Sequence, residues 1–506
     1  MVGHIFWGAL FSRLFGSGFE ALQISGLVAG FLGGAALYFW LRNAGVQPGR
    51  AFAGSLCLIF NPLYFVLSIT FMTDVPYVAA QTAAMWVLGY ASARGGFAAA
   101  ATGWLLALFA LSIRQVGVAI PAGIGIANLW RDGVHWRSIA TAIIPVVAFV
   151  AFQQGFEAWL AAKGALPLQF GVNSIEIADR LAGPISDIMK HASIGVAYLY
   201  MYGGLFMLPV VILAYRDLIA QHRSNRLIIH AATFGAAGIV TLIVILVHRP
   251  MPIWDHGVLS SSGIALGLYG MPEAPGWLRG IVTALASGGG AMAVVVLGTR
   301  IRQLLTGSLP TEATAAVVAA LATGAVLFAP LLVMPNRFDR YLLPIVPCMI
   351  VVMLVSGSNT RQLGTPAGHR GARLAALSSV VLFAGFAAFA IAGTRDSLAD
   401  QRARLAALNH ALSLGYPRDQ INAGWVLNGW HLYGRVGALK GIGALASWYN
   451  DPLIEIGHHR SHGYEVIARM PVNRTLPWAW GADAPVLVER RLPGEGTFVG
   501  PPMQNR

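Results

Sequence analysis

Apolar runs of about 18 or more residues recur along this chain from Leu22 to Ile391, and they constrain its fold more than any other feature. Each run is long enough to cross a hydrocarbon core of about 30 Å as a helix. Because lipid cannot satisfy backbone polar groups, only helices or a closed barrel can span it. The runs lack the alternation of apolar and polar residues typical of barrel strands, so they predict helices. The composition agrees, since 11% of the residues are charged, against about 25% in a soluble domain.

These runs predict an all-α polytopic membrane domain over residues 1–393, with about eleven spanning helices. The short runs 97–113 and 116–130 are expected to span separately or to form a re-entrant pair. The candidate spans are 18–41, 51–70, 75–93, 97–113, 116–130, 138–154, 194–214, 227–247, 279–299, 311–334, 340–356 and 375–393.

Basic residues indicate the orientation of the helices, because they gather in cytoplasmic loops. Every second loop is short, basic and nearly free of acids, so we place these loops in the cytoplasm. The net charge of +13 is then explained by topology and does not indicate nucleic-acid binding. The arginines of this set are Arg42, Arg50, Arg94, Arg131, Arg137, Arg216, Arg223, Arg226, Arg300, Arg302, Arg361, Arg370 and Arg373.

The two ends of the chain are expected on the opposite side of the membrane, in the periplasm or outside the cell. Residues 1–17 have the apolar spacing of an amphipathic interfacial helix. Residues 394–506 lose the long apolar runs and predict a small soluble α/β domain, with a helix to about Leu414 and strands near 464–469 and 484–490. The tryptophans of this domain fit either a small core or a face that stacks on sugar rings.

Asp74 is the candidate catalytic residue, in the sequence Thr73-Asp74-Val75-Pro76 at the expected outer end of two helices. A carboxylate at a membrane boundary can act as a base or bind a divalent metal. It can also cap a helix whose first turn contains proline. All three interpretations are consistent with the sequence.

Basic residues in the outer loops are candidates for binding a lipid phosphate. Arg114 interrupts an apolar segment, where an arginine usually faces a cavity or an anion, or else reaches toward headgroups. Arg337 and Arg340, followed by Tyr341, share one helical face and can grip a phosphate with two guanidinium groups. Asp339 can neutralise one of them, and headgroup binding is the alternative role.

A further outer loop carries Arg249 and the sequence Trp254-Asp255-His256. We assign Arg249 to the phosphate-binding set and the three following residues to acceptor or sugar binding. Asp255 and His256 are also suited to proton transfer or metal binding. The alternative is that the loop only terminates a helix, where a histidine is electrostatically favourable.

Several short motifs together resemble the GT-C class of polyprenyl-phosphate-sugar-dependent glycosyltransferases. The similarity is to the bacterial branch related to protein O-mannosyltransferases and the aminoarabinose lipid A transferase. The matching segments are Gly3-His4 with the following LFSRLFG, Asn61-Pro62-Leu63, Thr73-Asp74-Val75-Pro76, Arg340-Tyr341-Leu342-Leu343-Pro344, Gly415-Tyr416-Pro417, Ile421-Asn422-Ala423-Gly424-Trp425 and Asn428-Gly429-Trp430.

The resemblance implies an inverting transfer of a sugar from a polyprenyl-phosphate carrier to a glycan, lipid or protein acceptor. The reaction is expected at the outer face of the bacterial inner membrane, in the cell envelope. Asp74 matches an acidic residue that organises the site, with a divalent metal as a candidate cofactor, and Arg340 matches a residue near the lipid phosphate. The expected partners are the bilayer, the donor lipid and the acceptor, with no nucleic acid.

The sequence departs from the family at its start. The family carries its general base on the first outer loop, after an initial spanning helix, whereas no Asp or Glu precedes Glu20 here. Two expectations stay open: a further helix and acid precede residue 1, or the catalysis is altered. The rival function is a non-enzymatic membrane protein, either a transporter or an envelope-assembly factor.

Overall fold

A computed structural model describes residues 2–164, 172–247, 250–252, 257–264, 272–334, 338–356, 366–432, 452–479 and 484–493. The chain divides into two compact units. The membrane unit comprises Met1–Leu166, Asn173–Val258 and Gly276–Ala390, and the C-terminal unit comprises Pro167–Val172, Leu259–Pro275 and Ile391–Arg506. The second unit therefore includes two internal segments of the chain in addition to its end.

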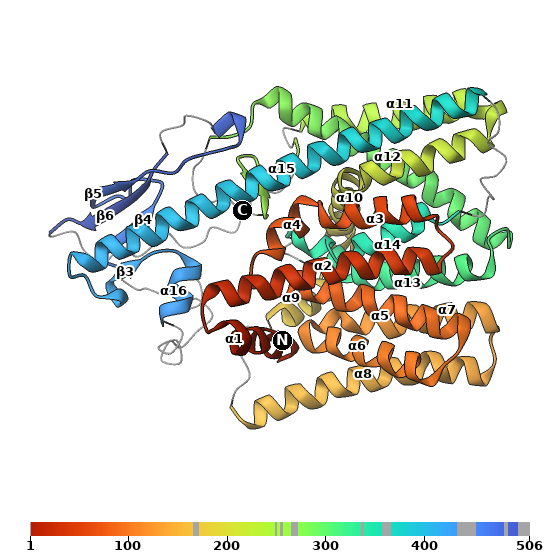
Figure 1. Cartoon of the computed structure of the whole chain (residues 1–506), viewed down its shortest axis with the longest axis horizontal. Coiled ribbons are helices and arrows are strands. Elements are labelled where there is room, and N and C mark those ends of the chain that lie inside the picture. Colours follow the sequence, from red (N-terminus) through yellow and green to blue (C-terminus); the bar gives the residue numbers. More distant parts are fainter. Residues whose placement is uncertain are drawn as a thin grey trace. The chain divides into compact units, whose positions relative to one another are not determined.

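Helices make up the membrane unit, as the apolar runs predict (Figure 1). Their bounds are α1 Val2–Phe15, α2 Phe19–Asn43, α3 Pro48–Ile59, α4 Pro62–Ser68, α5 Asp74–Arg94, α6 Phe97–Ile113, η1 Gln115–Val118, α7 Ala119–Asp132, α8 Trp136–Ala162, α9 Val172–Leu181, α10 Ile185–Gln221, η3 Arg223–Asn225, α11 Arg226–Leu246, α12 Gly276–Leu305, α13 Thr311–Val333, η5 Asp339–Leu342, α14 Ile345–Leu354 and the start of α15 Pro366–Ser413.

Seven helices in the described part of the chain are long and apolar enough to cross a membrane, and α3 with α4 makes an eighth if this bent pair is one span. The seven are Phe19–Asn43, Trp136–Ala162, Ile185–Gln221, Arg226–Leu246, Gly276–Leu305, Thr311–Val333 and Arg373–Ser413. The other expected spans are helical too, but they are shorter or less apolar. The helical membrane fold is confirmed, while the larger number of about eleven spans stays a prediction.

The sequence Asn61-Pro62 explains why the expected span 51–70 is two helices bent by 66°. The side chain of Asn61 accepts hydrogen bonds from the backbone N–H groups of Leu63 and Tyr64 and so caps α4. Pro62 occupies the first position of α4, where its missing N–H costs nothing, and it disfavours a helical conformation for the residue before it. After α4 the chain turns through residues 69–73 into α5.

Glycines let the helices of this unit approach one another closely. At Gly204 of α10, an added Cβ would overlap the backbone of Gly290 and lie 2.3 Å from the carbonyl oxygen of Ala286, both on α12. Small residues at helix contacts are typical of membrane proteins, where close packing replaces the hydrophobic drive. By contrast, α11 leaves apolar side chains such as Ile239 and Leu242 exposed, as expected of a surface covered by lipid.

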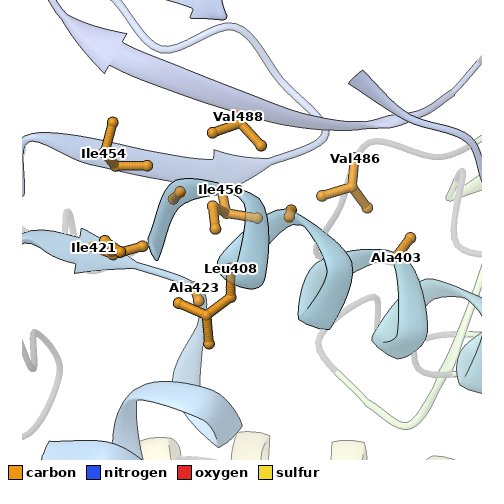
Figure 2. Close-up of a cluster of buried hydrophobic side chains, with 10 residues drawn as sticks. Ala403, Leu408, Ile421, Ala423, Ile454, Ile456, Val486 and Val488 are labelled. Carbon is orange, nitrogen blue, oxygen red and sulfur yellow. The ribbon is translucent and has the colours of Figure 1, made fainter. Parts of the chain in front are cut away.

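The C-terminal unit packs a small sheet against the end of α15, as the expected α/β domain requires (Figure 2). The strand order is β3-β4-β6-β5, with β3 parallel to β4 and the other pairs antiparallel. The strands are β3 Ile421–Asn422, β4 Ile454–Gly457, β5 Tyr464–Met470 and β6 Val486–Arg491; the unit also holds β1 Leu259–Ser260, β2 Gly263–Ile264, α16 Trp425–Leu432, η7 Arg418–Gln420 and η10 Pro477–Ala479. Its core residues are Ala403, Ala407, Leu408, Ala411, Ile421, Ala423, Ile454, Ile456, Val486 and Val488.

Candidate functional site

Asp74 and Arg114 form a short ion pair at the first turn of α5. Asp74 is 1% exposed, and its Oδ1 accepts a hydrogen bond from Nη1 of Arg114 at 2.6 Å. The negative charge also lies at a helix N-terminus, where the helix dipole favours it. Thr73 precedes the helix and makes no side-chain capping bond. The buried carboxylate therefore holds an arginine from a different part of the chain.

A break between two helices brings Arg114 to this position. α6 ends at Ile113, Arg114 adopts an extended conformation with φ −141° and ψ 136°, and η1 begins at Gln115. α6 lies beside α5 in the fold (Figure 1). The arginine that interrupts the apolar sequence thus has a specific anionic partner. A partner is expected, because a buried arginine without one is energetically costly.

Tyr341 joins this pair to Arg340. Its ring centroid lies 5.6 Å from the Cζ atom of Arg114 and 5.7 Å from that of Arg340, and Arg340 also lies 5.0 Å from the ring centroid of Phe338. These separations suit cation–π contacts. We call Asp74, Arg114, Arg340 and Tyr341 the Asp74 cluster.

The charges of the Asp74 cluster do not balance. Asp74 compensates Arg114, whereas the partly buried guanidinium of Arg340 makes no hydrogen bond or ion pair within the described ranges, and its Nε is buried without a partner. A buried donor without an acceptor is costly. Among the described residues, the rings of Phe338 and Tyr341 contact this guanidinium, so it is suited to bind an anion.

Asp339 anchors a loop segment to η5. Its Oδ1 accepts the backbone N–H of Arg340 at 2.8 Å and that of Val258 at 2.9 Å. A Cβ on Gly257 would lie 2.6 Å from Oδ2, so the close approach of this segment requires glycine. The expected role of Asp339 was to neutralise an arginine; the hydrogen bonds give it the additional role of fixing the backbone of Arg340.

His4 is a residue of this region that the sequence singled out only as part of a motif. Its ring stacks on Phe71 with centroids 3.9 Å apart and an interplanar angle of 22°. Its Nε2 lies 3.4 Å from the carbonyl oxygen of Phe71, three residues before Asp74. The side chain is 5% exposed, and its Nδ1 is buried without a partner among the described residues.

Five of the predicted site residues lie outside the described residues. They are Arg249, Trp254, Asp255, His256 and Arg337. Their assignments to phosphate, acceptor or sugar binding therefore stay predictions. Asp74, Arg114, Arg340 and Tyr341, which the sequence analysis also selected, come together although they are far apart along the chain.

The surroundings of Asp74 do not fit the metal considered from the sequence. Within the described ranges, no three His, Cys, Asp or Glu side chains gather into a metal-binding group. One oxygen of the carboxylate is engaged by an arginine, whose positive charge opposes a nearby divalent cation. The described residues around Asp74 are therefore poorly suited to hold a divalent metal.

Comparisons with known proteins give a distant similarity. No protein-family model matches the sequence, and no curated protein matches it. Two crystal structures of ArnT from Cupriavidus metallidurans are similar to the whole chain, one bound to undecaprenyl phosphate with a TM-score of 0.35 and one in the apo state with a TM-score of 0.34. Each is 14% identical, and each comparison covers 96% of this chain and 87% of that chain. A likeness of this size assigns no function.

Proposed function

We propose that this chain is a membrane glycosyltransferase that moves a sugar from a polyprenyl-phosphate carrier to an acceptor. The reaction would take place at the outer face of the bacterial inner membrane, with the C-terminal domain on that side. The observation that carries the proposal is the uncompensated guanidinium of Arg340 beside a buried, compensated Asp74–Arg114 pair. A cation with no ion-pair partner among the described residues, on a helical unit built to span lipid, suits a lipid-borne phosphate.

The chemistry of such a transfer requires stabilisation of negative charge on the leaving group. When the bond between the sugar and the phosphate oxygen breaks, the electron pair stays on the phosphate, and fixed cations nearby lower the free energy of that state. Arg340 supplies the free charge and a planar donor set that matches phosphate geometry. We include Arg249 and Arg337 in this phosphate-binding set on sequence grounds, and Trp254, Asp255 and His256 in the acceptor or sugar set.

Asp74 contributes by holding Arg114. Its Oδ1 accepts a hydrogen bond from the guanidinium of Arg114 at 2.6 Å. Arg114 in turn lies within cation–π distance of Tyr341, whose ring also contacts Arg340. Loss of the Asp74 charge would release Arg114 and disturb both neighbours, so Asp74 acts on the reaction by organising the cations around it.

The test uses the purified full chain in lipid nanodiscs. Undecaprenyl phosphate binding is compared for wild type, Arg340→Ala and Arg94→Ala; Arg94 closes the opposite end of α5 and contacts Tyr90. A charged hydrogen bond contributes about 1.5–3 kcal/mol, so Arg340→Ala is expected to weaken binding about 10- to 100-fold, with Arg94→Ala unchanged. Equal binding by all three proteins would remove Arg340 from the site.

A second measurement separates an enzyme from a transporter or an assembly factor. Nanodiscs containing undecaprenyl-phosphate sugars are incubated with candidate acceptors, and the appearance of free undecaprenyl phosphate is followed for wild type and Asp74→Asn. The proposal predicts release with wild type and a large loss with Asp74→Asn. If wild type binds the lipid but never releases its sugar, the chain is a lipid-binding membrane protein without transferase activity.

A further inference from the structure

α1 holds His4 firmly against the segment that carries Asp74. A Cβ at Gly3 would overlap the Ser112 side chain of α6, so the two helices touch there. Trp7 of α1 donates from Nε1 to the carbonyl oxygen of Ser25 at 3.0 Å, which fixes α1 against α2. Together with the stacking of His4 on Phe71, these contacts place the imidazole beside the turn that leads into α5.

The hydrogen bond to Phe71 determines the tautomer of His4. A carbonyl oxygen can only accept, so Nε2 carries the proton of the neutral ring. The lone pair then lies on Nδ1, which is buried without a partner in the part of the chain that the structure describes. Burial lowers the pKa of His4, while the bond to Phe71 and the charge of Asp74 oppose this change.

The acidic side chains that contact the turn before α5 and η5 already have hydrogen-bond partners. Oδ1 of Asp74 accepts from Arg114, and Oδ1 of Asp339 accepts two backbone N–H groups. A neutral imidazole with a free lone pair is a better proton acceptor near neutral pH. The negative charge of Asp74, which interacts with His4, would stabilise the imidazolium that forms.

We propose that His4 is the general base of the transfer, accepting at Nδ1 the proton of the acceptor's attacking hydroxyl or amine; the inference rests on the proposed function. The acceptor's oxygen or nitrogen forms a bond to the sugar's anomeric carbon. The bond from that carbon to the phosphate oxygen breaks, and its electron pair leaves with the polyprenyl phosphate. The acceptor's proton moves to Nδ1, while Nε2–H stays on the carbonyl oxygen of Phe71. Nδ1 is buried in the structure. Therefore α1 or the turn at 69–73 must move to expose it when the acceptor binds.

The experiment compares His4→Gln, His4→Phe and His4→Ala with wild type in nanodiscs. Glutamine retains an N–H donor for the Phe71 carbonyl and has no proton-accepting nitrogen, and phenylalanine retains only the stacking. General base catalysis contributes about 10²- to 10⁴-fold, so both substitutions are expected to lower kcat at least a hundredfold with little change in undecaprenyl phosphate binding. The acidic limb of the kcat/KM profile is expected to disappear, and added imidazole to restore part of the activity of His4→Ala. His135→Gln, at an exposed histidine before α8, is the matched control.

The outcomes separate this inference from the proposed function. If wild type transfers sugar and His4→Gln does so at a similar rate with an unchanged pH profile, His4 is a structural residue and the inference is wrong. If His4→Gln is active and His4→Phe is not, the role of His4 is its hydrogen bond to Phe71 and not proton transfer, and the inference is again wrong. Absence of transfer by wild type, with lipid binding intact, would instead overturn the proposed function.

Discussion

The Asp74 cluster and a second charged group in the C-terminal unit treat buried charge in opposite ways. In the C-terminal unit, the carboxylate of Asp400 accepts hydrogen bonds from Arg404 at 3.0 Å, His458 at 2.6 Å and Arg474 at 3.3 Å. Arg404 also donates to the carbonyl oxygen of Ile456 in β4. We call Asp400, Arg404, His458 and Arg474 the Asp400 network.

The two groups differ in whether each guanidinium has an acidic partner. The side chains of the Asp400 network are at most 9% exposed and bind one another and the sheet. In the Asp74 cluster, one ion pair is complete and a further guanidinium remains without a partner in the described residues. Arg404 and Arg474 share the carboxylate of Asp400, so these guanidinium groups help to hold the fold together. A guanidinium with no acidic partner among the described residues, such as that of Arg340, is instead suited to an anionic ligand.

The largest expected effect is on folding, in Asp400→Asn. Removing one partner of a buried charged network leaves the others uncompensated, which costs about 3–5 kcal/mol. We expect the C-terminal unit to unfold at markedly lower denaturant concentration, measured by limited proteolysis of the full chain. Arg340→Ala, measured in parallel, is expected to leave that transition unchanged. Equal sensitivity of both variants would break the distinction between the two groups.

The next effect is a pH dependence of the stability of the C-terminal unit, and it comes from two glutamates on neighbouring strands. Glu455 of β4 and Glu489 of β6 lie directly opposite in register. Burial raises the pKa of Glu455 to about 7, the charge of Glu489 adds to this rise, and Asn422 and Arg404 oppose it. The folded state then binds more protons than the unfolded state between about pH 4.5 and 7, so stability falls as pH rises through that window.

Glu455→Gln tests this sign. The loss in wild type is on the order of 2–3 kcal/mol across the window, and the variant is expected to lack it and to be the more stable protein at pH 8. Unfolding of the C-terminal unit at several pH values provides the measurement, with Glu465→Gln, at an exposed pair with Arg490, as the control. A wild-type stability that rises between pH 5 and 7 would contradict the assignment.

A smaller effect is expected from Arg340→Lys. Lysine keeps the charge but replaces the planar set of donors with a point charge, so two-pronged binding of a phosphate is lost. We expect undecaprenyl phosphate to bind about tenfold more weakly, corresponding to about 1.4 kcal/mol, midway between wild type and Arg340→Ala. An unchanged affinity for undecaprenyl phosphate would show that binding at this position needs only a positive charge.

The smallest effect is expected from Gly257→Ala. The new methyl group would meet the carboxylate of Asp339, which holds the backbone of Arg340. Because the atoms that must move away belong to the end of the Asp339 side chain, we expect a loss of only a few fold in lipid phosphate affinity, with the thermal transition of the membrane unit unchanged. Ala substitution at Gly235, where an added Cβ meets open space, is the control.

The sequence predicts the helical fold well. The length of each apolar run is set by the thickness of the lipid that a helix must cross and does not depend on which helices pack together. The strands at 464–470 and 486–491 fall within two residues of their expected places. The break at Asn61-Pro62 was not predicted, because residues 51–70 form one apolar run. The local signal for a helix start, an asparagine followed by proline, was nevertheless present in the sequence.

The candidate site was predictable only in its parts. Asp74, Arg114 and Arg340 stand out because charges in apolar surroundings are costly. The short connection between α5 and α6 agrees with the pairing of Asp74 and Arg114, because helices joined in this way are antiparallel neighbours. The contacts of Tyr341 with both arginines were not predictable, because they join segments far apart along the chain. His4 was read as part of an interfacial helix, and the free lone pair on its Nδ1 follows from a carbonyl 67 residues away. The Asp400 network joins α15 to segments after β4 and β5, which no local pattern indicates.

The bend between α3 and α4 has a consequence for the path of the chain toward Asp74. Because α4 is turned by 66° from α3, its seven residues rise only about 4 Å along the axis of α3. The chain therefore runs mostly sideways before the turn at 69–73, so α5 starts away from the axis of α3. From Asp74 to Arg94, α5 then rises about 31 Å, close to the thickness of a hydrocarbon core of about 30 Å. One sideways step thus separates the start of α5 from the end of α3, and the two charged ends of α5 lie about one membrane thickness apart.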